Sequence, residues 1–485
     1  MNHFSAGRLA MLCALGVGSA VAASATDRIP ITTSSADARQ AYLKGRDLSE
    51  KLRATDARKF FEEAAAKDPS FALAQVGLAN TAGTAKEFFA AVGRAVALAD
   101  KASEPERLVI CQLDAGAKGD PQRQKDCLTK LVAAFPDDER AHNLMGAYHF
   151  ARQDYAAAAE EYTKATAINP AFSQPYNQLG YSYRFLGKYA DAEQAFKKYI
   201  QLIPTDPNPY DSYAELLMKM GRFDDSIKNY EKALSLDPNF IASYIGIGND
   251  RVFMGQPEEA RKAFAKLTGV ARNDGEKRLA LFWTAMSYVH EGGTDKALAE
   301  VSEMAAIDEA TKDLAAQSGA LGQMGTILLE AGRADEAAAR YQQQLSVIDK
   351  ADVPAEVKQA AHRQALFQEA RVAVAKKDLA TARAKSTAYA AAVTEKKRPF
   401  EVRQQHELAG RLALAEKSYA AAVTELQQAN QQDPAVLYLL AVALQGKGDA
   451  AKAREVGAQA ADFNGLSATY GFVRGKARAI ATTPR

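Results

Sequence analysis

Apolar residues in the middle of the chain recur with the spacing of paired amphipathic helices. Within residues 176–204, Tyr176, Leu179 and Tyr183 fall at positions i, i+3 and i+7, which share one face of an α-helix. A second set at i, i+4 and i+7 follows in the same stretch: Ala192, Phe196 and Tyr199. The stretch therefore predicts two helices, each with one apolar face.

Glycine and proline mark where these two helices cross and where they end. Gly180 and Ala192 are small, which predicts that the helices approach closely at these positions. Gly187 predicts the end of the first helix, because a residue without a Cβ tolerates the left-handed conformation. Pro204 predicts the end of the second helix, since proline lacks a backbone N–H and clashes with the preceding turn. Together the residues describe a helical hairpin.

The hairpin pattern repeats at a constant interval, the one that separates Pro170, Pro204 and Pro238. The motif Tyr-x2-Leu-Gly-x2-Tyr, then Ala-x3-Phe, then Pro resembles the signature of the tetratricopeptide repeat family, and the interval is the period of that repeat. This resemblance implies an all-α fold, an α-solenoid of about twelve helical hairpins that forms a right-handed superhelix. Because one hairpin cannot bury its apolar faces alone, neighbouring hairpins are expected to stack.

The strength of the repeat pattern divides the chain into segments. A tetratricopeptide array is predicted for residues 36–270, with the best repeats at 139–272. The segments predicted around it are a signal peptide at 1–22 (with cleavage as late as 25), a flexible lead-in at 23–35, degenerate helical repeats at 275–398, C-terminal tetratricopeptide hairpins at 400–463 and a capping tail at 464–485.

The N-terminal segment 1–22 resembles a secretory signal peptide. Arg8 supplies a positive charge, residues 9–22 form an apolar run, and residues 20–22 (Ala-Val-Ala) offer a cleavage site between small side chains. A membrane anchor is the alternative, but the run is shorter than the roughly 20 residues of a spanning helix. We therefore expect an exported protein, periplasmic or secreted, with no integral membrane segment after signal removal. The style of the signal is typical of a Gram-negative bacterium.

Two cysteines, Cys111 and Cys127, remain once the signal peptide is removed. The register of the neighbouring repeats places Cys111 on the first helix and Cys127 on the second helix of one degenerate repeat. An exported pair in facing positions can form a disulfide. The alternative is that the two thiols are buried and act as small apolar side chains.

Neither the charge balance nor the motifs of the sequence indicate nucleic-acid binding, catalysis or metal binding. Lys plus Arg number 61 against 59 Asp plus Glu, and this near balance argues against a dedicated nucleic-acid surface. The sequence contains no phosphate-binding loop and no Gly-x-Ser-x-Gly motif. His406-Glu407 begins like a zinc-protease helix without a second His, and the pair His142 and His149 lacks further ligands. We therefore expect no catalytic residue, no metal and no cofactor.

The tetratricopeptide resemblance also implies a binding surface. In this family the first helix of each hairpin lines a concave groove that takes an extended peptide or a partner helix. The side chains expected to face that groove are Arg140, Asn143, Asn177, Tyr181, Arg184, Asp211, Glu215 and Asn249. Asparagine can hydrogen-bond a peptide backbone, and arginine can hold a carboxylate. The alternative is that these are ordinary solvent-facing residues.

These patterns favour an exported scaffold or adaptor, not an enzyme, that binds a protein or peptide in its concave groove. The sequence leaves two other functions open. One is an accessory subunit of a cell-envelope enzyme, or a cryptic enzyme of that kind, with its site in the degenerate segment 279–398. The other is a glycan-binding protein, which would need exposed aromatic platforms.

Overall fold

The computed structural model describes residues 28–394, 398–465, 467 and 469–483, so the predicted signal peptide lies outside it. Within these residues the chain is helical and contains no strand. Twelve consecutive antiparallel helix pairs, α1/α2 to α23/α24, are followed there by a single helix, α25. The predicted fold, an α-solenoid of about twelve hairpins, is confirmed.

The first seven hairpins are built from short helices. They are α1 (Ala36–Glu50), α2 (Ala54–Lys67), α3 (Ala72–Asn80), α4 (Ala85–Ala97), α5 (Glu104–Ala117), α6 (Pro121–Ala134), α7 (Glu139–Ala151), α8 (Tyr155–Ile168), α9 (Ser173–Phe185), α10 (Tyr189–Leu202), α11 (Asn208–Lys219), α12 (Phe223–Leu236), α13 (Ile241–Phe253) and α14 (Pro257–Val270), with a 3-10 turn at Ala99–Lys101. Helices α7 to α14 are 12–14 residues long.

Beyond α14 the helices vary in length, which ends the regular period. They are α15 (Asp274–His290), α16 (Thr294–Ala310), α17 (Leu314–Glu330), α18 (Ala334–Lys350), α19 (Ala355–Ala375), α20 (Leu379–Thr394), α21 (Pro399–Ala415), α22 (Tyr419–Leu426), α23 (Pro434–Lys447) and α24 (Ala450–Ala461), before the terminal α25 (Tyr470–Ala481). Helices α15 to α21 are 16–21 residues long. The motif loosens after residue 270 for this reason.

Glycines packed against aromatic rings set the close approach within the hairpins α7/α8 and α9/α10. A Cβ on Gly180 would lie 2.5 Å from the ring of Phe196, and a Cβ on Gly146 would lie 2.6 Å from the ring of Tyr162. The hairpin turn after α9 contains Gly187 with a φ of +72°, the left-handed conformation that the sequence predicts. A larger side chain at Gly180 would therefore force α9 and α10 apart.

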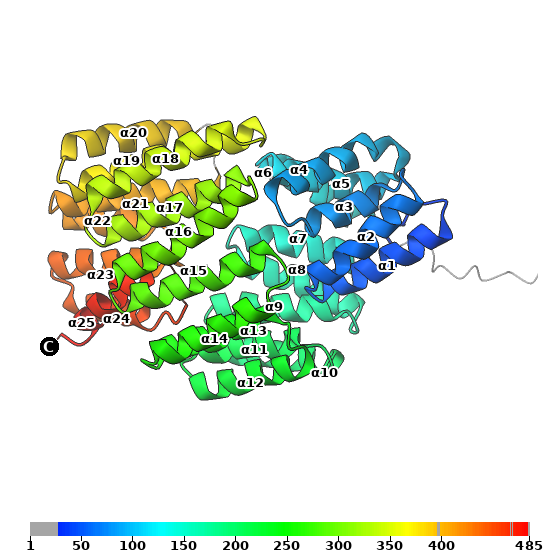
Figure 1. Cartoon of the computed structure of the whole chain (residues 1–485), viewed down its shortest axis with the longest axis horizontal. Helices are drawn as coiled ribbons and strands as arrows, with labels where there is room; N and C mark the ends of the chain where they lie inside the picture. The colour runs from blue at the N-terminus through cyan, green and yellow to red at the C-terminus, as the bar shows by residue number, and fades with distance from the viewer. Residues whose placement is uncertain (1–27, 395–397, 466, 468, 484–485) are drawn as a thin grey trace, which may run out of the picture.

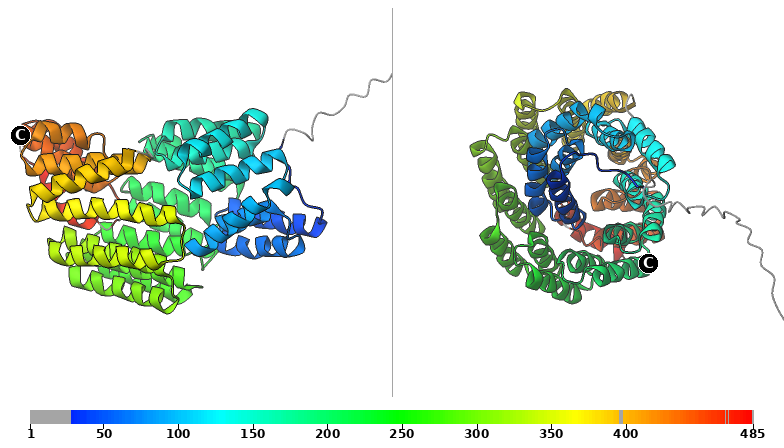
Figure 2. Two further views of the ribbon diagram at one scale, coloured as in Figure 1. Left: turned by 90° about the horizontal axis from the view of Figure 1, so that it is seen from above. Right: turned by 90° about the vertical axis from the view of Figure 1, so that its right-hand side faces the viewer.

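The hairpins wind into a superhelix whose successive turns touch. In Figure 1, α1–α8 lie on the right, α17–α25 on the left and α9–α14 below them, and along the long axis the helices form a ring (Figure 2, right). Arg53 lies 3.4 Å from Asp237, and Arg403 donates a hydrogen bond of 2.8 Å to the carbonyl of Arg152. These pairs are 184 and 251 residues apart in the sequence. Helices a whole superhelical turn apart therefore contact each other.

Both ends of the described chain pack against helices. Residues 28–35, where the sequence predicts part of a flexible lead-in, are extended and hydrogen-bonded to buried carboxylates of later hairpins. The partners of this segment lie up to 109 residues away, so no local pattern reveals them. In the predicted capping tail, α25 packs against α23 and α24, and also against α15. None of the described helices is both long and apolar enough to cross a membrane.

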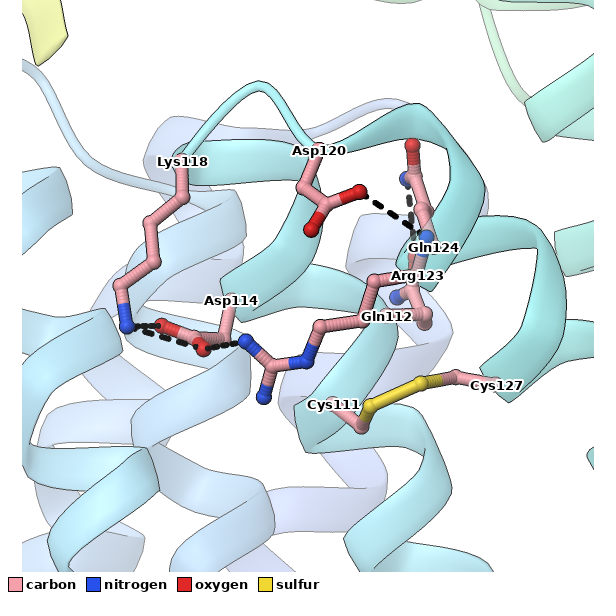
Figure 3. Close-up of a disulfide and its surroundings, with 8 residues drawn as sticks. All are labelled: Cys111, Gln112, Asp114, Lys118, Asp120, Arg123, Gln124 and Cys127. Carbon is pink, nitrogen blue, oxygen red and sulfur yellow. Dashed lines mark hydrogen bonds and ion pairs between the residues drawn. A yellow bond between two sulfur atoms is a disulfide. The ribbon is translucent and has the colours of Figure 1, made fainter.

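A disulfide joins the two helices of the third hairpin (Figure 3). It links Cys111 on α5 with Cys127 on α6, the two helices to which the sequence assigns them. Beside it, the buried carboxylate of Asp114 accepts from Lys118 at 2.8 Å and from Arg123 at 2.9 Å. The third hairpin is therefore fixed by a covalent link and by two ion pairs.

Candidate peptide-binding grooves

A cavity of about 730 Å³ lies against the first helices of three regular hairpins. Helices α9, α11 and α13 form its floor, and Trp283 of α15 contributes to one wall. Leu437 of α23 and the loop 462–465 close another side. We call this cavity the central groove. Because the loop comes from the following superhelical turn, the groove exists only in the wound solenoid.

Two of the predicted site residues form an ion pair in the central groove. Nη1 of Arg184 lies 3.1 Å from Oε2 of Glu215, and the pair bridges α9 and α11. The guanidinium also lies 4.9 Å from the ring centroids of both Tyr181 and Phe185. Arg184 therefore has a carboxylate partner already, and a ligand would meet a neutralised pair at this point.

Lys219 is a cation of the central groove to which the sequence analysis gave no role. Its ammonium donates to the backbone carbonyl of Phe463 and lies 3.7 Å from the centroid of that ring. Within the described residues no carboxylate forms an ion pair with it. Burial, together with the nearby charge of Arg184, lowers the pKa of Lys219 to about 8. The groove thus contains a lysine whose charge depends on pH near neutrality.

Two buried polar groups in the walls of the central groove have no hydrogen-bond partner among the described residues. One is the acceptor Oδ1 of Asn249, a predicted site residue that is only 5% exposed. The other is the donor Nε1 of Trp283. A buried polar group without a partner costs free energy, commonly about 1–3 kcal/mol. Two side chains that line the groove therefore each contain a buried polar atom without a partner in the described chain.

Three further predicted residues lie beneath the central groove and do not line it. Asn177 is fully buried, and neither side-chain amide atom is hydrogen-bonded within the described chain. Asp211 accepts from the hydroxyl of Ser243 at 2.7 Å, and burial raises its pKa to about 8, with Glu215 adding to the effect. The ring of Tyr181 packs edge-on against Phe196, and burial raises its pKa well above the usual value.

The last two predicted residues, Arg140 and Asn143, line a separate cavity of about 210 Å³. We call it the N-terminal groove; α1, α3, α5, α7 and α9 contribute to it, together with residues 29–31. Arg140 donates to Glu50 at 2.8 Å, and Asn143 donates to Gln174 at 3.0 Å. The predicted residues are thus divided between two grooves and the layer beneath one of them.

Sequence reasoning missed Lys219, Trp283 and the Phe463 loop. Lys219 could have been predicted, because it follows Glu215 by one helical turn and lies on the same helix face. Trp283 lies in α15, outside the regular repeats, and Phe463 is 244 residues from its partner Lys219. No local pattern signals a contact between superhelical turns.

The fold and the grooves define a class: a helical-repeat solenoid with peptide-sized grooves along its inner helices. Models of the tetratricopeptide repeat match residues 113–171, 161–194, 207–240 and 245–310. Tetratricopeptide repeats are therefore present between residues 113 and 310 of the chain. The fold of this family is typically a non-catalytic scaffold.

Comparison with other proteins adds three solved structures of low similarity, while no curated protein matches the chain. A tetratricopeptide repeat protein from Parabacteroides merdae ATCC 43184 is 15% identical, with 57% of this chain and 96% of that chain covered and a TM-score of 0.36. MamA from Desulfovibrio magneticus RS-1 is 17% identical, with 34% and 94% covered and a TM-score of 0.30. YrrB, described as a TPR protein with an unusual peptide-binding site, is 18% identical, with 38% and 92% covered and a TM-score of 0.26.

Proposed function

We propose that this chain is an exported scaffold that binds an extended segment of a partner protein in the central groove. The observation that carries the proposal is the pair of groups in the groove walls that lack a partner within the described chain, Oδ1 of Asn249 and Nε1 of Trp283. Every peptide unit other than one at proline offers one N–H donor and one C=O acceptor. When the two side chains turn toward the groove, a main chain bound there supplies a donor for Asn249 and an acceptor for Trp283.

The family and the groove size support the same proposal. Tetratricopeptide proteins commonly bind peptides or proteins. A volume of about 730 Å³ holds several residues of an extended chain. The neutralised Arg184–Glu215 pair, and Lys219 without an ion pair among the described residues, favour a segment of low net charge with at most one acidic side chain.

Export is part of the proposal and rests on the signal-like pattern of residues 1–22. N-terminal sequencing of the protein from its natural source tests it. A mature chain that begins at residue 23 or 26 and is recovered from the cell envelope or the medium supports export. A chain that retains residue 1 and is recovered from the cytoplasm contradicts it.

The experiment that tests groove binding uses a photo-crosslinking residue at Ile245, which lines the central groove. The matched control carries the same residue at Lys266, which is exposed on α14 and does not line the groove. We expect a crosslinked partner segment from position 245 and none from position 266. Equal crosslinking at both positions would contradict the assignment.

The crosslinked segment is then synthesised as a peptide and titrated against the purified chain. Trp283 is the only tryptophan of the sequence, so its emission reports on the central groove directly. We expect the emission to shift on binding, and Asn249→Ala to weaken binding at least tenfold. Lys266→Ala should leave the affinity unchanged. An affinity that does not respond to Asn249→Ala would remove the central groove as the site.

A further inference from the structure

The residues before α1 form an extended strap along the N-terminal groove. Residues 28, 30, 32 and 34 are exposed, while residues 29, 31, 33 and 35 are less exposed, which is the period of two of an extended chain. Ile29 and Ile31 pack against an apolar cluster that includes Phe71 and Val109. In Figure 2 (right), this dark blue segment runs inside the ring. We call residues 28–35 the strap.

Buried carboxylates hold the main chain of the strap. The N–H of Ile29 donates to Oδ2 of Asp138 at 2.8 Å, and the N–H of Thr32 donates to Oε1 of Glu106 at 2.7 Å. Asp138 is 2% exposed and Glu106 is 1% exposed. Hydrogen bonds from a main-chain N–H to a carboxylate are charge-assisted and stronger than neutral ones. Because they use the backbone, they do not depend on the strap's side chains.

The same two carboxylates also stabilise their own helices. Oδ1 of Asp138 caps α7 by accepting from the N–H of Ala141 at 2.9 Å. Oε2 of Glu106 accepts from the N–H of Ser103 at 2.8 Å, as part of the capping box of α5. Each carboxylate therefore uses one oxygen for a helix end and offers the other to an extended chain.

A third carboxylate extends the row, and a fourth is incompletely satisfied. Oδ1 of Asp68 accepts from Ser70, and its Oδ2 accepts from the hydroxyl of Thr33 at 2.5 Å. At the other end of the strap, Arg28 lies 3.6 Å from Oε1 of Glu139, with its own side chain 63% exposed. Oε2 of Glu139 is buried and has no hydrogen-bond partner among the described residues. The row thus includes one carboxylate oxygen that the described strap leaves without a donor.

Within the described residues, the strap fills the N-terminal groove incompletely and adjoins a helix at one end only. A volume of about 210 Å³ remains beside residues 29–31. Among the described residues, the chain enters a helix only after residue 35, where α1 begins. Replacement of the strap by another extended segment would therefore require no rearrangement of the helix pairs.

We propose that the N-terminal groove is a second peptide-binding site, and that the strap is its built-in competitor. The ligand that fits is an extended segment that begins with a basic residue. Two branched aliphatic residues follow, the first directly after the basic residue and the second two positions later, as in Arg28-Ile29-Pro30-Ile31. A tethered strap acts at a high effective concentration. The apparent Kd of a partner is then its intrinsic Kd divided by the fraction of time for which the strap leaves the groove free.

The test uses the full chain and a labelled synthetic peptide of residues 27–36. In the variant Ile29→Asp/Ile31→Asp, two carboxylates enter the apolar part of the groove, so the strap should leave it. We expect this double variant to bind the peptide at least tenfold more tightly than the wild type, measured by fluorescence anisotropy. A peptide with the same two substitutions should not bind.

Further variants identify the carboxylate row as the binding element. In the double variant, Glu106→Gln and Asp138→Asn should each weaken peptide binding at least tenfold, while both retain an oxygen for the helix end. The matched control is Glu104→Gln, which alters an exposed carboxylate of the same helical turn. Circular dichroism and thermal melting show whether each variant is folded before its binding is compared.

Three results would overturn the proposal. One is a folded double variant that does not bind the peptide, and another is binding that Glu106→Gln and Asp138→Asn leave unchanged. The third is a wild-type dimer in light scattering that the double variant loses, because the occupant would then be the strap of a second copy. None of these results concerns the central groove, which the emission of Trp283 reports separately.

Discussion

The two grooves are built on the same inner face of the solenoid, yet one is occupied and the other is open. In the N-terminal region, Asp68 caps the turn after α2 by accepting from the N–H of Ser70, and its second oxygen accepts from the hydroxyl of Thr33 in the strap. In the middle of the array, Asp237 also caps its turn, by accepting from Asn239, but its second oxygen faces Arg53 of another superhelical turn. The same cap position thus binds an extended chain in one region and holds two superhelical turns together in the other.

The difference shows which part of the repeat determines binding. Glycine–aromatic packing is the same beneath both grooves: a Cβ on Gly77 would lie 2.4 Å from Phe61, and a Cβ on Gly246 would lie 2.0 Å from Tyr230. The packing between successive hairpins therefore does not distinguish the grooves. The distinction lies in the groups at the repeat ends, and in segments that arrive from elsewhere in the chain.

The largest effect is expected from the disulfide, because a cross-link is present in the N-terminal region and the central hairpins have none. For the 16-residue separation of Cys111 and Cys127, loop closure predicts a stabilisation of about 3 kcal/mol. Cys111→Ser/Cys127→Ser should therefore lose protection from hydrogen exchange in α5 and α6, with α9–α13 unchanged. Mass spectrometry after alkylation, with and without reductant, is the prior check. Full alkylation without reductant would show that the native pair is not bonded.

The second effect is an overpacked groove floor. Gly246→Leu places a side chain where a Cβ alone would lie 2.0 Å from the ring of Tyr230, and such overpacking costs roughly 1–3 kcal/mol. Gly269→Leu is the matched control, since a Cβ on this helical glycine meets nothing within 4 Å. We expect a lower melting temperature and altered Trp283 emission for the first variant only. Equal melting temperatures for the two variants would contradict close packing at Gly246.

The sequence predicted the hairpins because their determinants are local. Gly180 and Phe196 belong to one copy of the motif, and Gly187 adopts the left-handed turn that its residue type allows. The repeat register also predicted two residues of the central groove floor, Arg184 and Glu215. These features recur at a constant interval, so each copy of the motif supports the interpretation of the others.

The segments that reach the two grooves from elsewhere in the chain could not be predicted, because their contacts join distant parts of the sequence. The register cannot show that Phe463 reaches Lys219, or that Ile29 reaches Asp138, over 244 and 109 residues. Nor does it show that Tyr181 turns toward Phe196 and away from the central groove. Such contacts depend on the pitch of the whole superhelix, to which every hairpin contributes.

The third effect is a pH dependence of opposite sign in the two regions. Hydrogen bonds from Ser70 and Thr33 lower the pKa of Asp68, so its stabilisation is present above the unfolded pKa and is lost as pH falls through the folded value. Burial raises the pKa of Asp250 to about 8, so its ionisation destabilises α13 as pH rises from about 4 to 8.

Local hydrogen exchange at several pH values checks both signs. Asp250→Asn should remove the loss of protection in α13 at high pH, and should stabilise that helix by roughly 1–2 kcal/mol at pH 8. Asp68→Asn should remove the acid sensitivity of the strap and leave α13 unchanged. A central region that weakens with acid in the wild type would reverse the assigned sign for Asp250.

The smallest effect is expected at Arg28, and it shows whether charge or backbone hydrogen bonds hold the strap. The ion pair of Arg28 with Glu139 spans 3.6 Å, and the Arg28 side chain is 63% exposed, so solvent screens it and its contribution is about 0–1 kcal/mol. Arg28→Ala should therefore change the binding of the 27–36 peptide less than fivefold, and 0.5 M salt should have a similarly small effect.

Ile29→Asp alone should release the strap much more strongly. If Arg28→Ala released it as fully, charge would hold the strap and the backbone hydrogen bonds to Asp138 and Glu106 would be secondary. The N-terminal groove would then select basic segments by their charge, and the two isoleucines would no longer define its ligand.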